Sequence, residues 1–375
     1  MTSSASSSEL YAWVRLSLEP NLGPAKARQL LAHFGLPHQL YEQSVGTLSR
    51  YIPTQLATQL HAAPTAELEQ HIQQTLLWGQ VSDQHILCLA DSAYPAALLN
   101  LHDPPLVIYA KGQLSQLQHQ GMAIVGARSA TTQGLANAHD FAKFLASEGW
   151  CIVSGLALGI DTAAHQGALA AQQPNSTIAV LATGMDRVYP ASNRELAHQI
   201  AEKGLLLSEF QLGQSAMRHH FVRRNRLVAA LSRGVLVVEA ALKSGSLSTA
   251  RLAAEIGREV FAIPGSIHSP LHKGCHQLIR SGAKLVESAE HILEEMGHTL
   301  PLPFNDAPPQ QTPLPSDLAL ELQQVAEAMG TQPLSADQVQ NRCTGLTAAQ
   351  VGAALAQLEL FDLVRLQPGG VYIRT

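Results

Sequence analysis

The sequence has few of the features that mark the more easily recognised protein classes. Only 14% of its 375 residues are charged and 5% are aromatic, and its four cysteines lie far apart. Because they form no C-x-x-C pair, we expect reduced thiols and no zinc site. No apolar run reaches the length of a membrane span. The start, MTSSASSS, has neither a basic nor an apolar region, so we expect no signal peptide and a cytoplasmic protein.

Several motifs of nucleotide and metal chemistry are also missing. There is no G-x-x-x-x-G-K-[ST] loop for ATP and no G-x-G-x-x-G after a strand for a dinucleotide. There is no H-E-x-x-H and no G-x-S-x-G. We therefore expect no metal, no cofactor and none of the enzyme classes that depend on these motifs.

The patterns that are present divide the chain into segments. We expect a disordered tail at 1–8, a small helical domain at 9–80, a Pro-rich linker at 299–316 and a C-terminal domain at 317–375. In the helical domain, L-G-P-A-K-A-R-Q-L-L fits either a helix-hairpin-helix or a small packed bundle. The last domain shows three helical stretches and a hairpin around P-G-G, the layout of a winged helix.

Residues 81–298 have a different periodicity. Short apolar runs such as M-A-I-V-G, C-I-V-S-G and G-V-L-V-V-E-A alternate with helix-length segments. Buried parallel strands read as continuous apolar runs because helices cover both faces of the sheet. The pattern therefore predicts an α/β domain with a doubly wound, mostly parallel sheet.

Charge is unevenly distributed along the chain. The net charge is −5, and residues 299–375 hold three Lys/Arg against seven Asp/Glu, or −4. That sign disfavours phosphate binding by the C-terminal domain and favours a protein partner. Between Phe210 and Val238, by contrast, the charged residues are all arginines. Arginines interleaved with an aromatic residue suit a groove for single-stranded DNA. The candidates are Arg218, Phe221, Arg223, Arg224, Asn225 and Arg226.

Four strand ends carry glycines, hydroxyls and cations. Ligands of open α/β sheets bind at the carboxyl ends of strands, so we expect one large anion to span these turns. Each turn alone is also compatible with ordinary packing and a solvated cation. The candidates are Gly126, Arg128, Ser154, Gly155, Ala157, Gly159, Gly184, Arg187, Arg194, Lys243, Ser244, Gly245, Ser246 and Thr249.

Asp161 and His165 lie four residues apart, on one face of a predicted helix. The pair could serve as a general base with its orienting partner, or could brace the preceding loop. No nucleophile lies nearby in the sequence, which favours the brace. Glu209 and Glu239, at strand ends, are likewise expected to hydrogen-bond to loops.

Together the motifs resemble the bacterial DNA processing protein A family (DprA, also called Smf). They include I-V-G-A-R, S-G-L-A-L-G-I-D-T-A-A-H, F-V-R-R-N-R and K-S-G-S-L-S-T-A, in order over roughly 85–290. The resemblance implies an extended Rossmann-like domain that binds single-stranded DNA. It also implies a protein that protects incoming DNA during natural transformation, loads RecA onto it, forms a homodimer through the Rossmann-like domain and is not an enzyme. Arg128 matches the family's phosphate-binding arginine.

Two positions depart from the family pattern: Cys275-His276 replaces T-N after Gly274, and Ala191 stands where a cation often follows Y-P. An alternative function is a nucleotide-processing enzyme on the same fold, such as a nucleoside-monophosphate phosphoribohydrolase. Its P-G-G-x-G-T-x-x-E loop is absent, because Pro264-Gly265 continues into S-I-H. A third possibility is a regulatory protein that acts through the acidic C-terminal domain.

Overall fold

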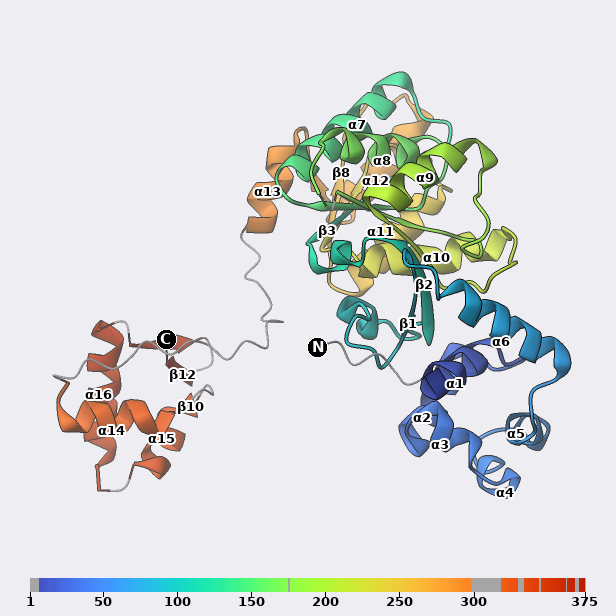
Figure 1. The fold of residues 1–375 in the computed structure, drawn as a ribbon. Helices are drawn as coiled ribbons and strands as arrows, with labels where there is room; N and C mark the ends of the chain where they lie inside the picture. The colour runs from blue at the N-terminus through green and yellow to red at the C-terminus, as the bar shows by residue number, and fades with distance from the viewer. Residues whose placement is uncertain are drawn as a thin grey trace. The chain divides into compact units, whose positions relative to one another are not determined.

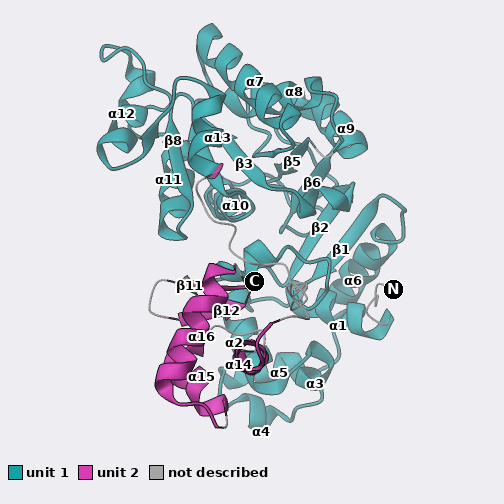
Figure 2. Cartoon of the chain, turned by 90° about the vertical axis from the view of Figure 1, so that its left-hand side faces the viewer, with its two compact units in different colours: residues 1–296 teal, residues 297–375 magenta. Residues whose placement is uncertain are grey.

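The computed structural model describes residues 7–174, 176–297, 318–329, 334–343, 345–361, 363–367 and 371–374 (Figure 1). The chain divides into two compact units, residues 1–296 and 297–375 (Figure 2). The predicted linker at 299–316 and most of the predicted tail lie outside the described residues. The first helix begins at Ser7, so the last two residues of that tail are helical rather than disordered.

The N-terminal part of the first unit is helical. Pro24 takes the first position of α2 and Gly35, with φ of 87°, ends it, both as expected. The structure divides into compact units at residues 296 and 297, and not at residue 80. The predicted boundary between a helical domain and the α/β domain at residue 80 therefore remains a prediction. The helices are α1 (Ser7–Leu18), α2 (Pro24–Phe34), α3 (Pro37–Tyr41), α4 (Val45–Leu48), α5 (Thr54–His61) and α6 (Ala66–Trp78).

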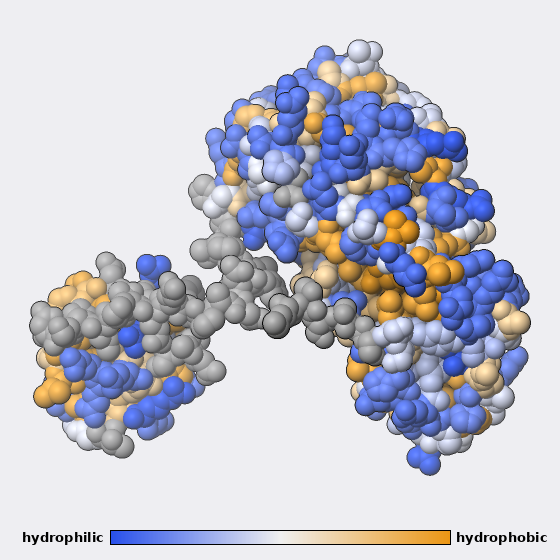
Figure 3. Space-filling model, in the orientation of Figure 1, coloured by the Kyte–Doolittle hydropathy of each residue, from blue (hydrophilic) through white to orange (hydrophobic). Residues whose placement is uncertain are grey.

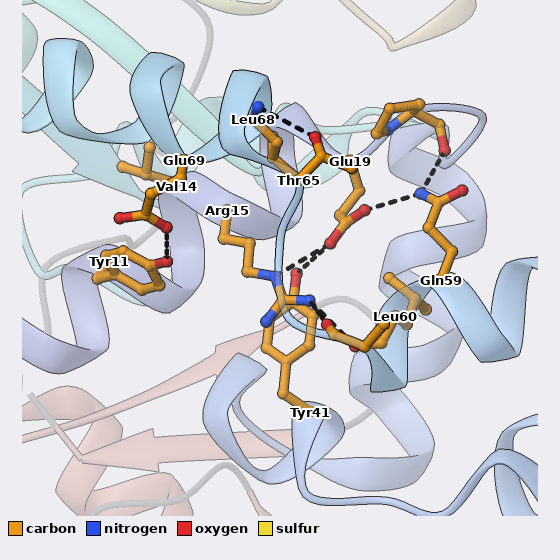
Figure 4. A network of polar contacts seen from close by, with 12 residues as sticks. Tyr11, Val14, Arg15, Glu19, Tyr41, Gln59, Leu60, Thr65, Leu68 and Glu69 are labelled. Atoms are coloured by element: carbon orange, nitrogen blue, oxygen red, sulfur yellow. Dashed lines mark hydrogen bonds and ion pairs between the residues drawn. The ribbon is translucent and has the colours of Figure 1, made fainter.

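A buried polar network ties these helices together (Figure 4). The Arg15 guanidinium donates to Glu19 at 3.1 Å and to the carbonyl of Leu60 at 3.1 Å. It also lies over the Tyr41 ring, 3.9 Å from the centroid. Gln59 donates to the second oxygen of Glu19 at 2.7 Å. Both members of the Arg15–Glu19 pair therefore have several partners, which is what a buried ion pair requires.

Within the described residues the first unit holds one nine-stranded sheet, in the order β1-β2-β6-β5-β4-β3-β7-β8-β9. The strands from β6 to β9 in this order are parallel, and β2 joins β6 antiparallel with β1 outside it. This confirms the predicted mostly parallel sheet. The strands are β1 (Gln84–Cys88), β2 (Val107–Gly112), β3 (Gly121–Val125), β4 (Cys151–Ser154), β5 (Thr177–Val180), β6 (Leu205–Ser208), β7 (Gly234–Val237), β8 (Glu259–Ala262) and β9 (Lys284–Leu285).

Helices cover both faces of the sheet. Alternate strand residues point to opposite faces, and the residues on both faces are apolar, so each face must be buried. Ala123 and Val125 pack with α10 and α11, whereas Met122 and Ile124 pack with α7 and α8. The helices are α7 (Thr132–Ser147), α8 (Ile160–Ala170), α9 (Arg194–Lys203), α10 (Arg218–Ala230), α11 (Gly245–Glu255), α12 (Lys273–Arg280) and α13 (Ala289–Gly297), with short 3-10 turns η1 (Ala96–Asn100), η2 (Leu114–Gln118), η3 (Ala191–Asn193) and η4 (Pro270–His272).

The second unit has its own core and a winged-helix arrangement, as expected. Its buried side chains come from all three helices and from β10 and β11. The elements are α14 (Leu320–Met329), β10 (Leu334–Ser335), α15 (Ala336–Arg342), α16 (Ala348–Leu360), β11 (Val364–Gln367) and β12 (Val371–Arg374). The strands pair in the order β10-β12-β11.

On the face of the first unit in Figure 3, hydrophilic residues cover much of the area over α7 to α9, and an apolar area lies between α10 and α6. No helix in the described parts of the chain is long and apolar enough to cross a bilayer. The same residues bring together no group of three metal-ligating side chains. The cysteines at 88, 151, 275 and 343 are buried free thiols.

Candidate nucleic-acid interface

The sheet topology places a crevice at the carboxyl end of β3. From β3 the chain adds β4, β5 and β6 on one side, then returns to add β7 and β8 on the other. The turns after β3 and β7 therefore diverge, which is where open α/β sheets bind their ligands. A cleft of about 800 Å³ opens at this edge. Its lining includes Gly126, Arg128, Gly155, Ala157, Asp161, Tyr189, Ala216, Arg218, Phe221, Arg224, Asn225, Lys243, Ser244, Gly245, Ser246 and Thr249.

The floor of the cleft is formed where α10 crosses the turn after β4. The Arg224 side chain is buried and donates to the carbonyl of Val180 at 2.6 Å. Its guanidinium packs so closely on Gly155 that a Cβ there would lie 1.8 Å from Nη1. Glycine is thus required at this position for the arginine to reach the cleft. Burial lowers the pKa of Arg224, against the attraction of Asp161.

Three further cations surround this floor, each exposed: Arg128, Arg218 and Lys243. The Arg128 guanidinium carbon lies 5.1 Å from the centroid of the Phe221 ring. Tyr189 packs edge-on against the same ring, with centroids 5.5 Å apart. The cleft therefore combines cations with two adjacent aromatic rings, as a groove for stacked bases and phosphates does.

The wall opposite the Arg128 turn is the start of α11. Ser244 caps this helix by accepting from the backbone N–H of Ser246 at 3.3 Å, and the two hydroxyls lie 2.6 Å apart. Asn225 donates to the carbonyl of Gly245 at 3.4 Å, which joins α10 to this wall. A helix start with hydroxyls favours anions.

Asp161 and His165 do not form a catalytic pair. The Asp161 carboxylate accepts from the N–H groups of Gly155 and Ala157, at 3.1 and 3.4 Å. Burial raises its pKa, while Arg224 and these N–H groups oppose the rise. His165 is fully buried and its Nδ1 lies 2.8 Å from Thr177 Oγ1. Burial lowers the pKa of His165 to about 3, so the ring is neutral and has no access to a ligand.

The two glutamates hold other parts of the site in place. Glu239 accepts from the N–H of Thr131 at 3.0 Å and from its hydroxyl at 2.6 Å, which fixes the start of α7 beside the Arg128 turn. Glu209 is buried against Arg223 and Arg226. Burial raises the pKa of Glu209, and the two arginines counteract the shift.

Several predicted site residues lie outside the cleft. Ser154 is buried in the sheet and donates to the carbonyl of Ile124 at 2.7 Å. Gly159 is the N-cap residue of α8, with φ of 78°, and a Cβ there would lie 2.3 Å from the carbonyl oxygen of Ala127. Both therefore shape the turn without lining the cleft.

The arginines of α10 also separate. Arg226 is buried and contacts Asp103 and Glu209, so it holds α10 to the rest of the fold. Arg223 is exposed but bonds to Glu209 at 3.0 Å. Neither side chain lines the cleft.

The turn after β5 contributes differently from expected. Gly184 packs against the 211–214 segment, while Arg187 and Arg194 line a second hollow. Its contribution to the cleft is Tyr189, which was not among the residues predicted from the sequence although it is the tyrosine of the Y-P pair before Ala191. Ala216 was missed too, and the apolar side chain carries no signal of its own.

The two departures from the family pattern lie away from the cleft lining. Cys275 is buried, with its sulfur 3.7 Å from the carbonyls of Val237 and Val238. Ala191 is exposed in the η3 turn. Both departures therefore concern packing and the cleft's surroundings.

The fold and cleft define a class: a Rossmann-like α/β protein with a cationic, aromatic-lined site at the carboxyl end of its sheet. A family model described as DNA recombination-mediator protein A matches residues 85–297, and one described as the DprA winged helix domain matches 308–370. The chain belongs to the DNA recombination-mediator protein A family, which confirms the resemblance inferred from its motifs.

Relatives cover most of the chain. Protein Smf of Escherichia coli (strain K12) is 40% identical over 81% of this chain and 80% of its own length. Protein Smf of a Synechocystis species is 33% identical over 99% and 100%. The X-ray structure of DNA processing protein A from Streptococcus pneumoniae matches with a TM-score of 0.66 and 34% identity, over 76% of this chain and 97% of that one.

A second solved structure bears on the ligand. It is described as giving structural insights into the single-stranded DNA binding mode of DNA processing protein A from Helicobacter pylori. It matches with a TM-score of 0.52 and 33% identity, over 56% of this chain and 95% of that one.

Proposed function

We propose that this protein binds single-stranded DNA without regard to sequence and passes it to a RecA-type recombinase during natural transformation. The cleft at the end of β3 carries the proposal, because it gathers four cations around two aromatic rings. The relative from Helicobacter pylori is described as binding single-stranded DNA, and it shares this fold.

The chemistry of the cleft suits a flexible strand. Arg128, Arg218 and Lys243 are exposed and can each neutralise a phosphate, while Arg224 presents a fixed charge from the floor. The faces of Phe221 and neighbouring rings can stack on any base, because every base has a π face. A duplex keeps its bases stacked inside, so the rings would favour single strands.

Binding is a better account of this cleft than catalysis. The carboxylate that lines it, Asp161, is buried and engaged by two backbone N–H groups. His165 is buried with a pKa of about 3 and cannot exchange protons with a ligand near neutral pH. With Asp161 and His165 set aside as acid–base groups, the charged groups that can contact a ligand are the cations, and cations bind anions such as phosphates.

The proposal predicts that Arg128→Ala and Arg218→Ala each weaken binding to single-stranded oligonucleotides of every sequence. We expect about a tenfold loss for each, the value of one charge-assisted contact. The slope of log affinity against log salt should become shallower by about 0.7 per lost phosphate contact. Fluorescence anisotropy across a salt series measures both quantities.

Lys143→Ala is the matched control, because Lys143 is an exposed cation on α7 outside the cleft lining. Equal affinity of the parent for single- and double-stranded DNA would contradict the proposal, as would parent-like binding by both arginine variants.

RecA delivery and homodimer formation through the Rossmann-like domain are parts of the same proposal. Assembly of RecA on DNA coated with a single-strand-binding protein should accelerate when the parent chain is added. The Arg128→Ala variant should accelerate it less, because a weaker DNA grip leaves fewer strands to pass on. Sedimentation of the parent chain tests the dimer separately.

A further inference from the structure

A second hollow of about 680 Å³ adjoins the cleft. It lies where the end of α6, strands β1, β2 and β6, helix α9 and the turn after β5 meet. Tyr189 and Ala216 line both hollows, so the two share a border. We call the second hollow the α9 groove; its lining includes Trp78, Lys111, Asp186, Arg187, Arg194 and His198.

Positive charge predominates in the α9 groove. Lys111, Arg187 and Arg194 line it, against the single carboxylate of Asp186 in its described lining. The existing ion pairs are loose: Arg187 lies 3.8 Å from Asp186, and Lys111 lies 3.9 Å from Asp83. Exposed pairs of this length contribute little, so these cations remain available to a phosphate.

The groove also has aromatic surfaces. Trp78 is half-buried and packs edge-on against Tyr109, with centroids 5.7 Å apart. Tyr189, at the border, is 50% exposed and touches Phe221 of the cleft. A strand lying over Phe221 therefore meets Tyr189 next, and Trp78 lines the same groove as Tyr189.

We infer that the α9 groove holds the continuation of the single strand bound in the cleft, its phosphates against Lys111 and Arg194 and a base against Trp78. The shared border and the same mix of cations and rings favour this occupant over an acidic protein segment, which would not need aromatic faces. The inference rests on the proposed function, and it makes the binding site longer than the cleft alone.

The test uses the full chain and oligothymidylates of two lengths, about 4 and about 16 nucleotides, which bracket common single-strand site sizes. The double variant Lys111→Gln and Arg194→Gln should bind the long oligomer at least about tenfold more weakly than the parent. Its salt slope for the long oligomer should become shallower by about 1.4, or 0.7 for each contact. For the short oligomer, affinity and slope should match the parent.

The control double variant is Lys143→Gln and Arg280→Gln, which removes two exposed helix cations outside both linings. It should match the parent for both oligomers. If the groove variant matches the parent with the long oligomer, the inference is wrong. It is also wrong if the groove variant weakens both lengths equally, because that result reports only a lower net charge. A parent chain that binds neither length defeats the proposed function itself.

Trp78 supplies a second readout. The long oligomer should quench tryptophan fluorescence, because a base stacks on the exposed part of this ring, and the short oligomer should not. In Trp78→Phe the quenching should disappear while the smaller phenyl ring keeps a face for stacking, so affinity should change little. Quenching that persists in this variant would place the strand elsewhere.

Discussion

Neighbouring arginines on α10 have different surroundings. Arg218 lines the cleft. Arg223 is also exposed but lies outside the cleft, where it bonds to Glu209 and its guanidinium carbon lies 5.9 Å from the centroid of the Phe210 ring. Arg224, one residue on, is buried in the floor. Composition predicts that this segment forms a basic surface. Which of its arginines line the cleft, however, depends on which face of the helix packs against the sheet.

This difference gives a prediction at the residue scale. Arg223→Gln should leave single-strand affinity within about twofold, because its charge is compensated by Glu209. Arg218→Gln, with the same loss of charge on the same helix, should weaken binding about tenfold. Anisotropy titrations of the two variants side by side decide the matter. Equal losses would mean that the strand follows the outer face of α10.

At the scale of elements, the sequence is a good guide to strands and a poor one to their order. Runs such as 122–126 and 234–240 predict β3 and β7 because strands buried on both faces must be apolar throughout. The two-residue strand β9 leaves no such signal. The expectation that four turns meet at one ligand assumed that their strands are adjacent.

The four strands are indeed consecutive in the sheet, in the order β5-β4-β3-β7, but their turns do not contribute equally to the cleft. β3 lies between β4 and β7, so the turns after these three strands surround one crevice. β5 is two strands from β3, and its turn therefore reaches the cleft only with Tyr189 while Arg187 faces the α9 groove. Order arises from long-range crossovers, and local periodicity does not encode it.

His165 links α8 to β5 and makes stability depend on pH. In the folded chain its pKa is about 3, so the ring stays neutral, whereas in the unfolded chain it takes up a proton near the ordinary value of 6.5. The unfolded state thus binds more protons between these values, and stability falls as pH falls. Between pH 7.5 and pH 5 this one group should remove about 2 kcal/mol.

His165→Asn tests the linkage, since asparagine can still donate to Thr177 but does not titrate. The variant should be less stable than the parent at about pH 7.5, because it loses packing around the ring. That deficit should shrink by about 2 kcal/mol at about pH 5. Urea unfolding at both values measures the difference, and a deficit independent of pH would show that His165 takes up protons equally in the folded and unfolded chains.

At the scale of the whole molecule, the two units have separate cores. The described core of the second unit consists of residues between 318 and 372, and the cores of the first unit include none of them. The cleft and the α9 groove are lined by residues of the first unit alone. The acidic composition of 299–375, at −4, adds no phosphate-binding charge.

A chain ending at residue 297 should therefore fold and keep its grip on single strands. Because it loses four net negative charges, its affinity should equal that of the parent or exceed it by up to about twofold at moderate salt, where distant charges are screened. Its thermal midpoint should match the transition that the first unit shows in the full chain, since the two units share no core.

RecA assembly, measured in parallel, tests what the winged helix contributes. A fragment that binds DNA normally but no longer accelerates assembly would assign the recombinase contact to the second unit. A fragment that folds but binds DNA more than about tenfold more weakly would instead place part of the DNA site on the winged helix.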